Sequence, residues 1–230
     1  MLKLLKTLIG ILLIPVAVGA AKAFYVAISG IDVLSNSLHV LERGVLAYLL
    51  LHVLIMRPVY IYVLGHEFVH VLATWICGGK IVSFSVTPSG GNVVTSKTNF
   101  FIELSPYFVP IYTLLLGPIF MLLRTLNVNI AHMSSVFLFL VGATLAFHFV
   151  MTSEVLRIKQ SDIAKSGFIF SLVLIFIGNL IIIIAVFTPF FDSISFAGFI
   201  KSAAANSIDL YRQLVNKIMA VAKIAGVWHI

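Results

Sequence analysis

The feature that most constrains this chain is a set of long segments without a charged residue. No Asp, Glu, Lys or Arg occurs between residues 125 and 153 or between residues 166 and 191. A helix needs about 20 apolar residues to cross the hydrocarbon core of a bilayer, and each charge at its centre costs about 2.5 to 3.5 kcal/mol. Both segments meet this requirement, so they predict membrane-spanning helices.

The composition agrees with a membrane protein. Hydrophobic residues make up 61% of the 230 residues and charged residues only 10%, which is more apolar surface than one soluble core can bury. The net charge of +7 lies in the breaks between apolar segments, which favours orientation in a membrane over binding of nucleic acid. We therefore expect a lipid bilayer as partner and no nucleic acid. The short length and the lack of a targeting extension favour a prokaryotic cytoplasmic membrane. The distribution of Lys and Arg over the links between the spans favours an N-terminus inside.

Apolar segments along the chain predict about five crossings. They cover residues 7–31, 44–77 with a break at Pro58, 104–123, 125–153 and 166–191, and residues 32–43 read as a short polar link. The expected fold is an all-α polytopic membrane protein.

Two further segments differ in character from the apolar spans. Residues 80–98 alternate β-branched and polar side chains around Pro88-Ser89-Gly90-Gly91-Asn92, which predicts a small β-hairpin. After Asp192 charged residues are spaced among apolar ones, which predicts an amphipathic interfacial helix. We therefore divide the chain into a transmembrane domain, residues 1–196, and an amphipathic interfacial tail, residues 197–230.

The most specific motif is His-Glu-Phe-Val-His at residues 66–70. Residues four apart lie on one helix face, so the imidazoles of His66 and His70 can bind the same zinc ion. Zinc activates water, and a neighbouring carboxylate can take the water's proton and pass it on. We predict that His66 and His70 are zinc ligands and Glu67 is the catalytic base, as in a zinc metalloendopeptidase. The alternative is a structural role in which these residues pair with one another or with Arg57.

A catalytic zinc needs one more protein ligand, from another segment. The candidates are Asp162, His148, Glu154 and Glu103. We favour Asp162, which starts the last span and can turn toward the motif helix; alternatively, Asp162 or Ser161 caps that helix. His148 is either a core histidine or a partner of the metal site, as a neighbour of a ligand or as an alternative ligand. Glu103 directly precedes its span, and we interpret it as a solvated boundary charge.

A family resemblance follows from these features together. The motif helix, its Gly78-Gly79 exit, the hairpin with glycines at 90 and 91, and a distal Asp resemble the site-2-protease family of intramembrane zinc metalloproteases, over residues 59–179. The usual distal signature of that family, Asn-Pro followed by Leu-Asp-Gly, is absent. The chain is therefore more similar to the minimal, divergent members.

The resemblance implies a function and a set of site residues. It implies zinc bound by His66, His70 and Asp162, with Glu67 as general base. It also implies that the substrates are transmembrane segments of other proteins. The hairpin residues that would pair with an unwound substrate strand are Gly90, Gly91 and Asn92.

Two other functional classes fit parts of the pattern. The chain can be a zinc-binding membrane regulator or chaperone without proteolytic activity, although every residue of the motif is present. It can also be a transporter in which the same residues form an ion or proton path. Transporters often carry duplicated halves, and the sequence has no such duplication.

Overall fold

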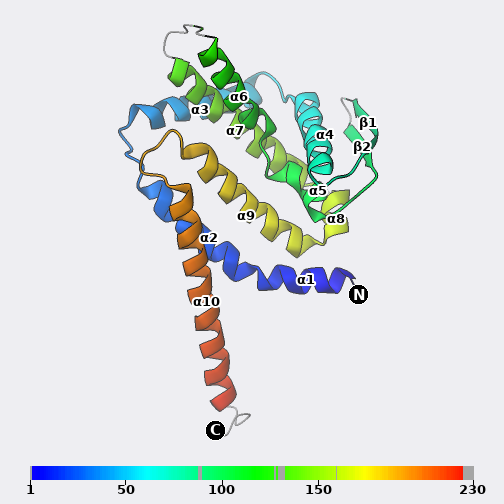
Figure 1. Cartoon of the computed structure of the whole chain (residues 1–230), viewed down its shortest axis with the longest axis vertical. Helices are drawn as coiled ribbons and strands as arrows, with labels where there is room; N and C mark the ends of the chain where they lie inside the picture. Colours follow the sequence, from blue (N-terminus) through cyan, green and yellow to red (C-terminus); the bar gives the residue numbers. More distant parts are fainter. Residues whose placement is uncertain (1, 88–89, 127, 129–132, 159, 225–230) are drawn as a thin grey trace.

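A computed structural model describes residues 2–87, 90–126, 128, 133–158 and 160–224 (Figure 1). Ten α-helices, one short 3-10 helix and one hairpin occur in this part of the chain. In order they are α1 (Leu2–Leu12), α2 (Ile14–Ser29), α3 (Asn36–Leu54), α4 (Val59–Ile76), β1 (Ile81–Thr87), β2 (Gly90–Thr95), α5 (Phe100–Leu104), η1 (Ser105–Tyr107), α6 (Ile111–Thr125), α7 (Met133–Leu156), α8 (Ser161–Ser166), α9 (Phe168–Phe187) and α10 (Phe196–Ile224).

Five helices in the described residues are long and apolar enough to cross a membrane. They are Leu4–Ser29, which joins α1 and α2, and α3, α4, α7 and α9. The prediction of an all-α polytopic membrane protein with about five transmembrane helices and a small hairpin is confirmed.

The prediction of a polar link at residues 32–43 is wrong for most of that range. α3 begins at Asn36, because the Ser35 hydroxyl caps it by accepting a hydrogen bond from Leu38 N at 3.3 Å. The charged Glu42 and Arg43 are exposed within this helix, while the apolar side faces the bundle. α3 is therefore a crossing of its own.

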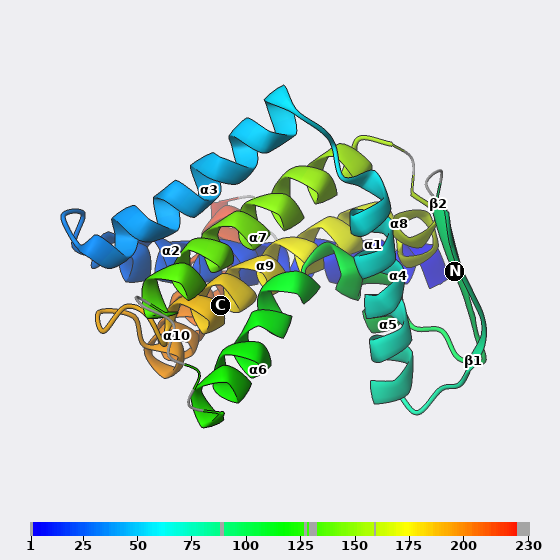
Figure 2. The same ribbon diagram turned by 90° about the horizontal axis from the view of Figure 1, so that it is seen from above.

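α3 packs closely along α7, and Figure 2 shows the two helices side by side. A Cβ atom at Gly44 would lie 2.9 Å from the carbonyl carbon of Phe139, and one at Gly142 would lie 3.1 Å from that of Leu41. The two backbones approach so closely that neither glycine has room for a side chain. Small residues permit the same close approach in membrane helices generally.

The span expected at residues 104–123 is broken. α5 and η1 together meet α6 at an angle of 78° and form either a bent sixth crossing or a re-entrant loop. Pro106 and Pro110 lie at the break, and proline cannot donate the backbone hydrogen bond that would continue a helix. Residues 127 and 129–132, within the expected span 125–153, lie outside the described residues.

The motif helix α4 is flanked by the hairpin, which lies at the edge of the molecule in both views (Figures 1 and 2). α4 begins directly after Pro58 and ends at Cys77, where Gly78 turns the chain with a φ of 72°. β1 and β2 then pair antiparallel, with Phe84 opposite Val93 and Val86 opposite Gly91. The expected turn residues Pro88 and Ser89 lie outside the described residues.

The last helix, α10, packs against α2 over its first half and projects beyond the other helices in Figure 1. Asn206 Nδ2 donates to the backbone oxygen of Gly19 at 3.3 Å, and the Tyr211 hydroxyl donates to that of Leu12. Beyond Tyr211 apolar residues such as Ile218 are exposed. Residues 225–230 of the predicted tail lie outside the described residues.

Candidate metal centre

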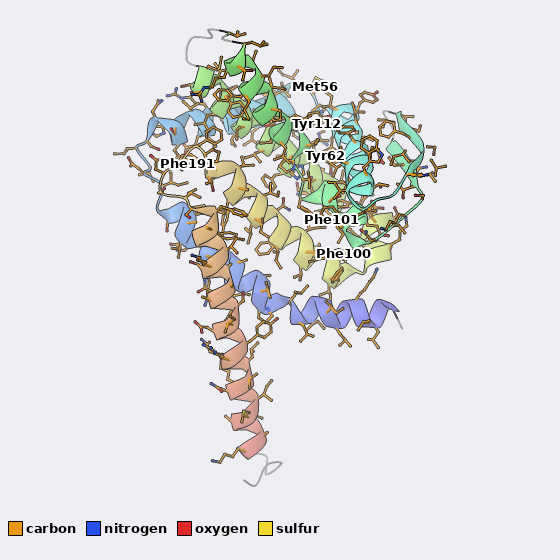
Figure 3. The ribbon with its side chains drawn as sticks, in the orientation of Figure 1. Met56, Tyr62, Phe100, Phe101, Tyr112 and Phe191 are labelled. Atoms are coloured by element: carbon orange, nitrogen blue, oxygen red, sulfur yellow. The ribbon has the colours of Figure 1, made fainter. Side chains whose placement is uncertain are left out.

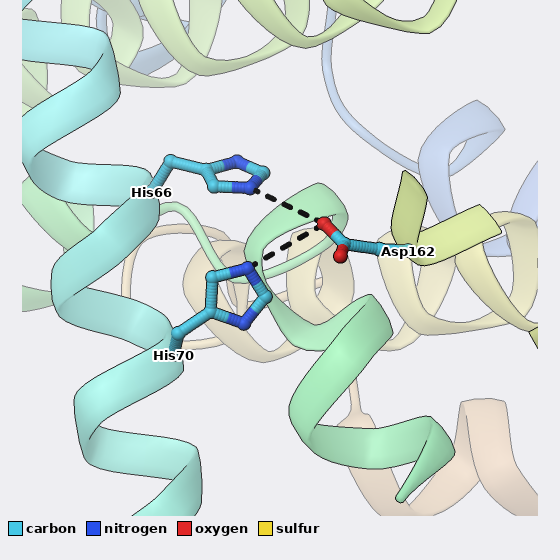
Figure 4. Close-up of side chains that lie close together, drawn as sticks. All are labelled: His66, His70 and Asp162. Carbon is cyan, nitrogen blue, oxygen red and sulfur yellow. Dashed lines mark ion pairs between the residues drawn. The ribbon is translucent and has the colours of Figure 1, made fainter. Parts of the chain in front are cut away.

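The two motif histidines lie one turn apart on α4. Their ring centroids are 5.0 Å apart, and both side chains are about nine-tenths buried. In Figure 4 both rings point away from α4 toward the same side chain, Asp162 of α8.

Asp162 completes a group of three potential metal ligands. Its Oδ2 lies 3.6 Å from His70 Nε2 and 4.0 Å from His66 Nε2 (Figure 4). The three ligand atoms all lie within 4.8 Å of one another, so the group can hold a metal ion. Ligand atoms about 2 Å from a tetrahedral ion are roughly 3.3 Å apart, which is close to the observed separations.

Backbone geometry determines which nitrogen of His70 faces the group. His70 Nδ1 lies 2.7 Å from the carbonyl oxygen of Ile102 in α5, a distance at which it donates its proton. No backbone N–H claims this carbonyl, because it lies in the last turn of α5 and the residue four positions on is Pro106; the Ser105 hydroxyl also approaches it, at 3.5 Å. When a metal ion is bound, this contact places the lone pair of His70 on Nε2, the atom that faces Asp162.

The carboxyl of Asp162 is held from several sides. The Tyr107 hydroxyl donates to Oδ2 at 3.2 Å, and the Ser161 hydroxyl donates to Oδ1 at 3.3 Å. Burial alone would raise the pKa of Asp162, but its contacts with His66 and His70 outweigh burial and hold that pKa well below its usual range. The residue is therefore an ionised carboxylate, the form that binds cations.

Asp162 lies in the separate short helix α8 and not at the start of the last span, α9, whose N-cap residue is Gly167; no side chain caps either helix, so neither Asp162 nor Ser161 has the capping role considered for it. The N-cap residue of α8 is Gln160, and no side chain caps this helix. The Asp162 side chain is instead directed toward the histidines (Figure 4).

Glu67 lies beside the three ligands but is not one of them. Its side chain is buried against β2, where a Cβ atom at Gly91 would lie 2.7 Å from Glu67 Oε1. The absence of a side chain at Gly91 therefore gives the Glu67 carboxyl its space.

The group opens into a cavity of about 420 Å³ between α4, β2, α5 and α8. Five consecutive residues of β2, Gly91 to Thr95, line it. Because alternate side chains of a strand point to opposite faces, five consecutive residues in one wall indicate that the backbone of β2 forms part of it. Asn92 belongs to this wall, whereas Gly90, the first residue of β2, lies just outside it. In the described residues the edge of β2 away from β1 has no strand partner.

Two of the other acidic candidates have different partners. Glu154 lies 3.3 Å from His52 Nε2 and 3.7 Å from Arg57 Nη1, away from the motif histidines. The interpretation of Glu103 as a solvated boundary charge is wrong. It is buried and accepts hydrogen bonds from Ser166 and Thr98, because α8 folds back over α5.

His148 is buried in α7 and does not belong to the three-ligand group. It lines a separate small cavity that it shares with His66.

Sequence reasoning missed Tyr107, which is fully buried and contacts the site in two ways. Its ring packs edge-on against His66, with centroids 5.1 Å apart, and its hydroxyl binds Asp162. Its position between Pro106 and Pro110 is the signal in the sequence that the helix breaks at this residue.

Comparison of the chain with protein-family models, curated proteins and solved structures found no match.

Proposed function

We propose that this protein is an intramembrane zinc metalloprotease that hydrolyses peptide bonds in or near transmembrane segments of other membrane proteins. The observation that carries the proposal is the convergence of His66, His70 and Asp162 beside Glu67 in one buried cavity. Two histidines and one carboxylate are a ligand set of catalytic zinc sites.

The presence of Glu67 next to the ligands favours zinc over other metals. Two histidines and one carboxylate also bind Fe²⁺ in oxygenases, so the ligands alone do not select the metal. Glu67, adjacent in sequence and in space, adds a carboxylate able to accept a proton, which hydrolysis requires. When bound, zinc supplies Lewis acidity that activates water for attack on an amide carbonyl.

Glu67 has the position of the proton carrier. It takes one proton from the attacking water as the oxygen bonds to the carbonyl carbon. It then gives that proton to the nitrogen as the C–N bond breaks. Its buried place against Gly91 holds the carboxyl inside the cavity throughout both transfers.

The free edge of β2 suits a substrate in extended form. A transmembrane helix protects its amide bonds with its own hydrogen bonds, and bilayer lipids offer no replacement partners. A strand edge that lines the cavity can replace those hydrogen bonds by adding the substrate as a third strand. Gly90, Gly91 and Asn92 begin this edge.

The substitution Glu67→Gln tests the proposal. It keeps the shape of the side chain and removes the base, so cleavage of a model transmembrane substrate falls by about 10²- to 10⁴-fold while zinc content stays at the wild-type level. Unchanged cleavage by the Glu67→Gln variant contradicts the proposed role. Zinc binding without cleavage in the wild type indicates an inactive regulator, and metal-dependent ion flux in liposomes without proteolysis indicates a transporter.

A further inference from the structure

The three candidate ligands differ in the hydrogen bonds that hold their side chains in place. His70 Nδ1 binds the Ile102 carbonyl, and the Asp162 carboxyl accepts from Tyr107 and Ser161. His66 is the exception, because its Nδ1 is buried and has no hydrogen-bond partner among the described residues. When Nε2 binds a metal, Nδ1 carries the proton and must donate it.

His148 also has a ring nitrogen without a hydrogen-bond partner. Its Nε2 is also buried and without a partner in the described part of the chain. The ring also contacts the backbone of Tyr107, and because Nε2 has no partner, this contact belongs to the other ring nitrogen, Nδ1, which donates to the carbonyl oxygen. With the proton on Nδ1, His148 Nε2 is a lone-pair acceptor.

Both histidines line one narrow cavity between α4, α6 and α7. The space open to the centre of a water molecule is about 10 Å³, which is roughly what a single water requires. Figure 3 shows Tyr62 and Tyr112, two further residues of its wall, on neighbouring helices.

The other polar side chains of the wall already have partners. The Tyr62 hydroxyl pairs with Thr152, and the Tyr112 hydroxyl donates to the backbone oxygen of Ile61 at 2.6 Å. Thr144 Oγ1 donates to the backbone oxygen of Leu140 at 2.7 Å. Among the side chains of the wall, the unsatisfied atoms are one donor, His66 Nδ1, and one acceptor, His148 Nε2.

We infer that this cavity is a binding site for one structural water, which accepts from His66 Nδ1–H and donates to His148 Nε2. The chain of hydrogen bonds then runs from His66 through the water and His148 to the Tyr107 backbone, with every donor facing an acceptor. His148 is thus a positioning residue that fixes the ring and tautomer of His66. Its effect on zinc rests on the proposed function; the water itself does not.

Zinc affinity of three variants tests the positioning role. In His148→Gln the amide oxygen takes the place of Nε2, so the acceptor is kept and affinity stays within about threefold of wild type. His148→Asn keeps a polar group only near the position of Nδ1. His148→Leu keeps no polar group at either position. Both are expected to bind zinc about 10- to 100-fold more weakly, the usual loss when the partner of a ligating histidine is removed. Equal affinity of the Gln and Asn variants overturns the inference.

A measurement on the metal-free protein separates this inference from the proposed function. Nitrogen-15 spectra of histidine-labelled protein should show His148 protonated on Nδ1, and magnetisation transfer from a bound water to the His66 ring that disappears in His148→Leu. A proton on Nε2 of His148, or no transfer from water, overturns the water site. A wild type that binds no zinc but gives these spectra contradicts the proposed function and leaves the water site standing.

Discussion

The two halves of the candidate metal centre are built in different ways. α4 supplies His66 and His70 from a regular helix of 18 residues, so their spacing follows from helix geometry alone. α8 supplies Asp162 from a helix of six residues without a side-chain cap. Its position depends on contacts with distant segments, namely Tyr107 with Asp162 and Ser166 with Glu103. The position of the two histidines is thus set by residues close in sequence, whereas the position of Asp162 is set only when distant segments pack together.

The largest effect is expected from removing a ligand of either half. His70→Ala and Asp162→Ala should each weaken zinc binding by at least about 100-fold, since losing even an indirect partner of a ligand costs 10- to 100-fold. Zinc content after purification and competition with a chelator measure the change. Asp209→Ala, at an exposed site on α10, is the matched control and should bind as wild type. Wild-type affinity in Asp162→Ala would remove α8 from the centre altogether.

A smaller effect is expected where the hairpin meets α4. In Gly91→Ala the new methyl group would overlap the Glu67 carboxyl and force it to move. We expect cleavage to fall about tenfold, a part of the 10²- to 10⁴-fold that a positioned base contributes, with zinc binding unchanged. Gly117→Ala, with no atom within 4 Å of the added Cβ, should leave both unchanged. A loss of zinc in Gly91→Ala would mean that the hairpin also holds the α4 half.

The smallest effect is expected from loosening α8 without touching a ligand. Ser166→Ala removes a buried hydrogen bond to the Glu103 carboxyl, at a cost of about 1.5 to 3 kcal/mol of stability. We expect a lower unfolding temperature and zinc affinity reduced severalfold, because Asp162 is then less well positioned. Ser153→Ala, on the exposed side of α7, is the control. Unchanged affinity at a lower unfolding temperature would show that α8 is positioned by other contacts.

The difference between the halves also explains what the sequence could predict. The spans expected at residues 7–31, 125–153 and 166–191, the motif helix and the hairpin follow from apolar length, periodicity and turn residues, which are local properties. The start of α3 was missed because Ser35, a single capping residue, extends the helix across charged positions. Glu103 was misread because nothing near it in sequence signals that Ser166 and Thr98 will enclose it.

The proline that bends the chain between α5 and α6 also supplies the site with chemistry. Within a helix each carbonyl oxygen accepts from the N–H four residues later, and because that residue is Pro106, the oxygen of Ile102 has no backbone donor there, only a contact of 3.5 Å with the Ser105 hydroxyl. His70 takes that oxygen, so the site gains an acceptor without any added polar side chain in an apolar bundle. In a membrane protein, a proline four positions after a buried carbonyl therefore indicates a backbone hydrogen-bond acceptor that a count of polar side chains does not include. This gives a rule for searching other apolar sequences for partners of a lone histidine.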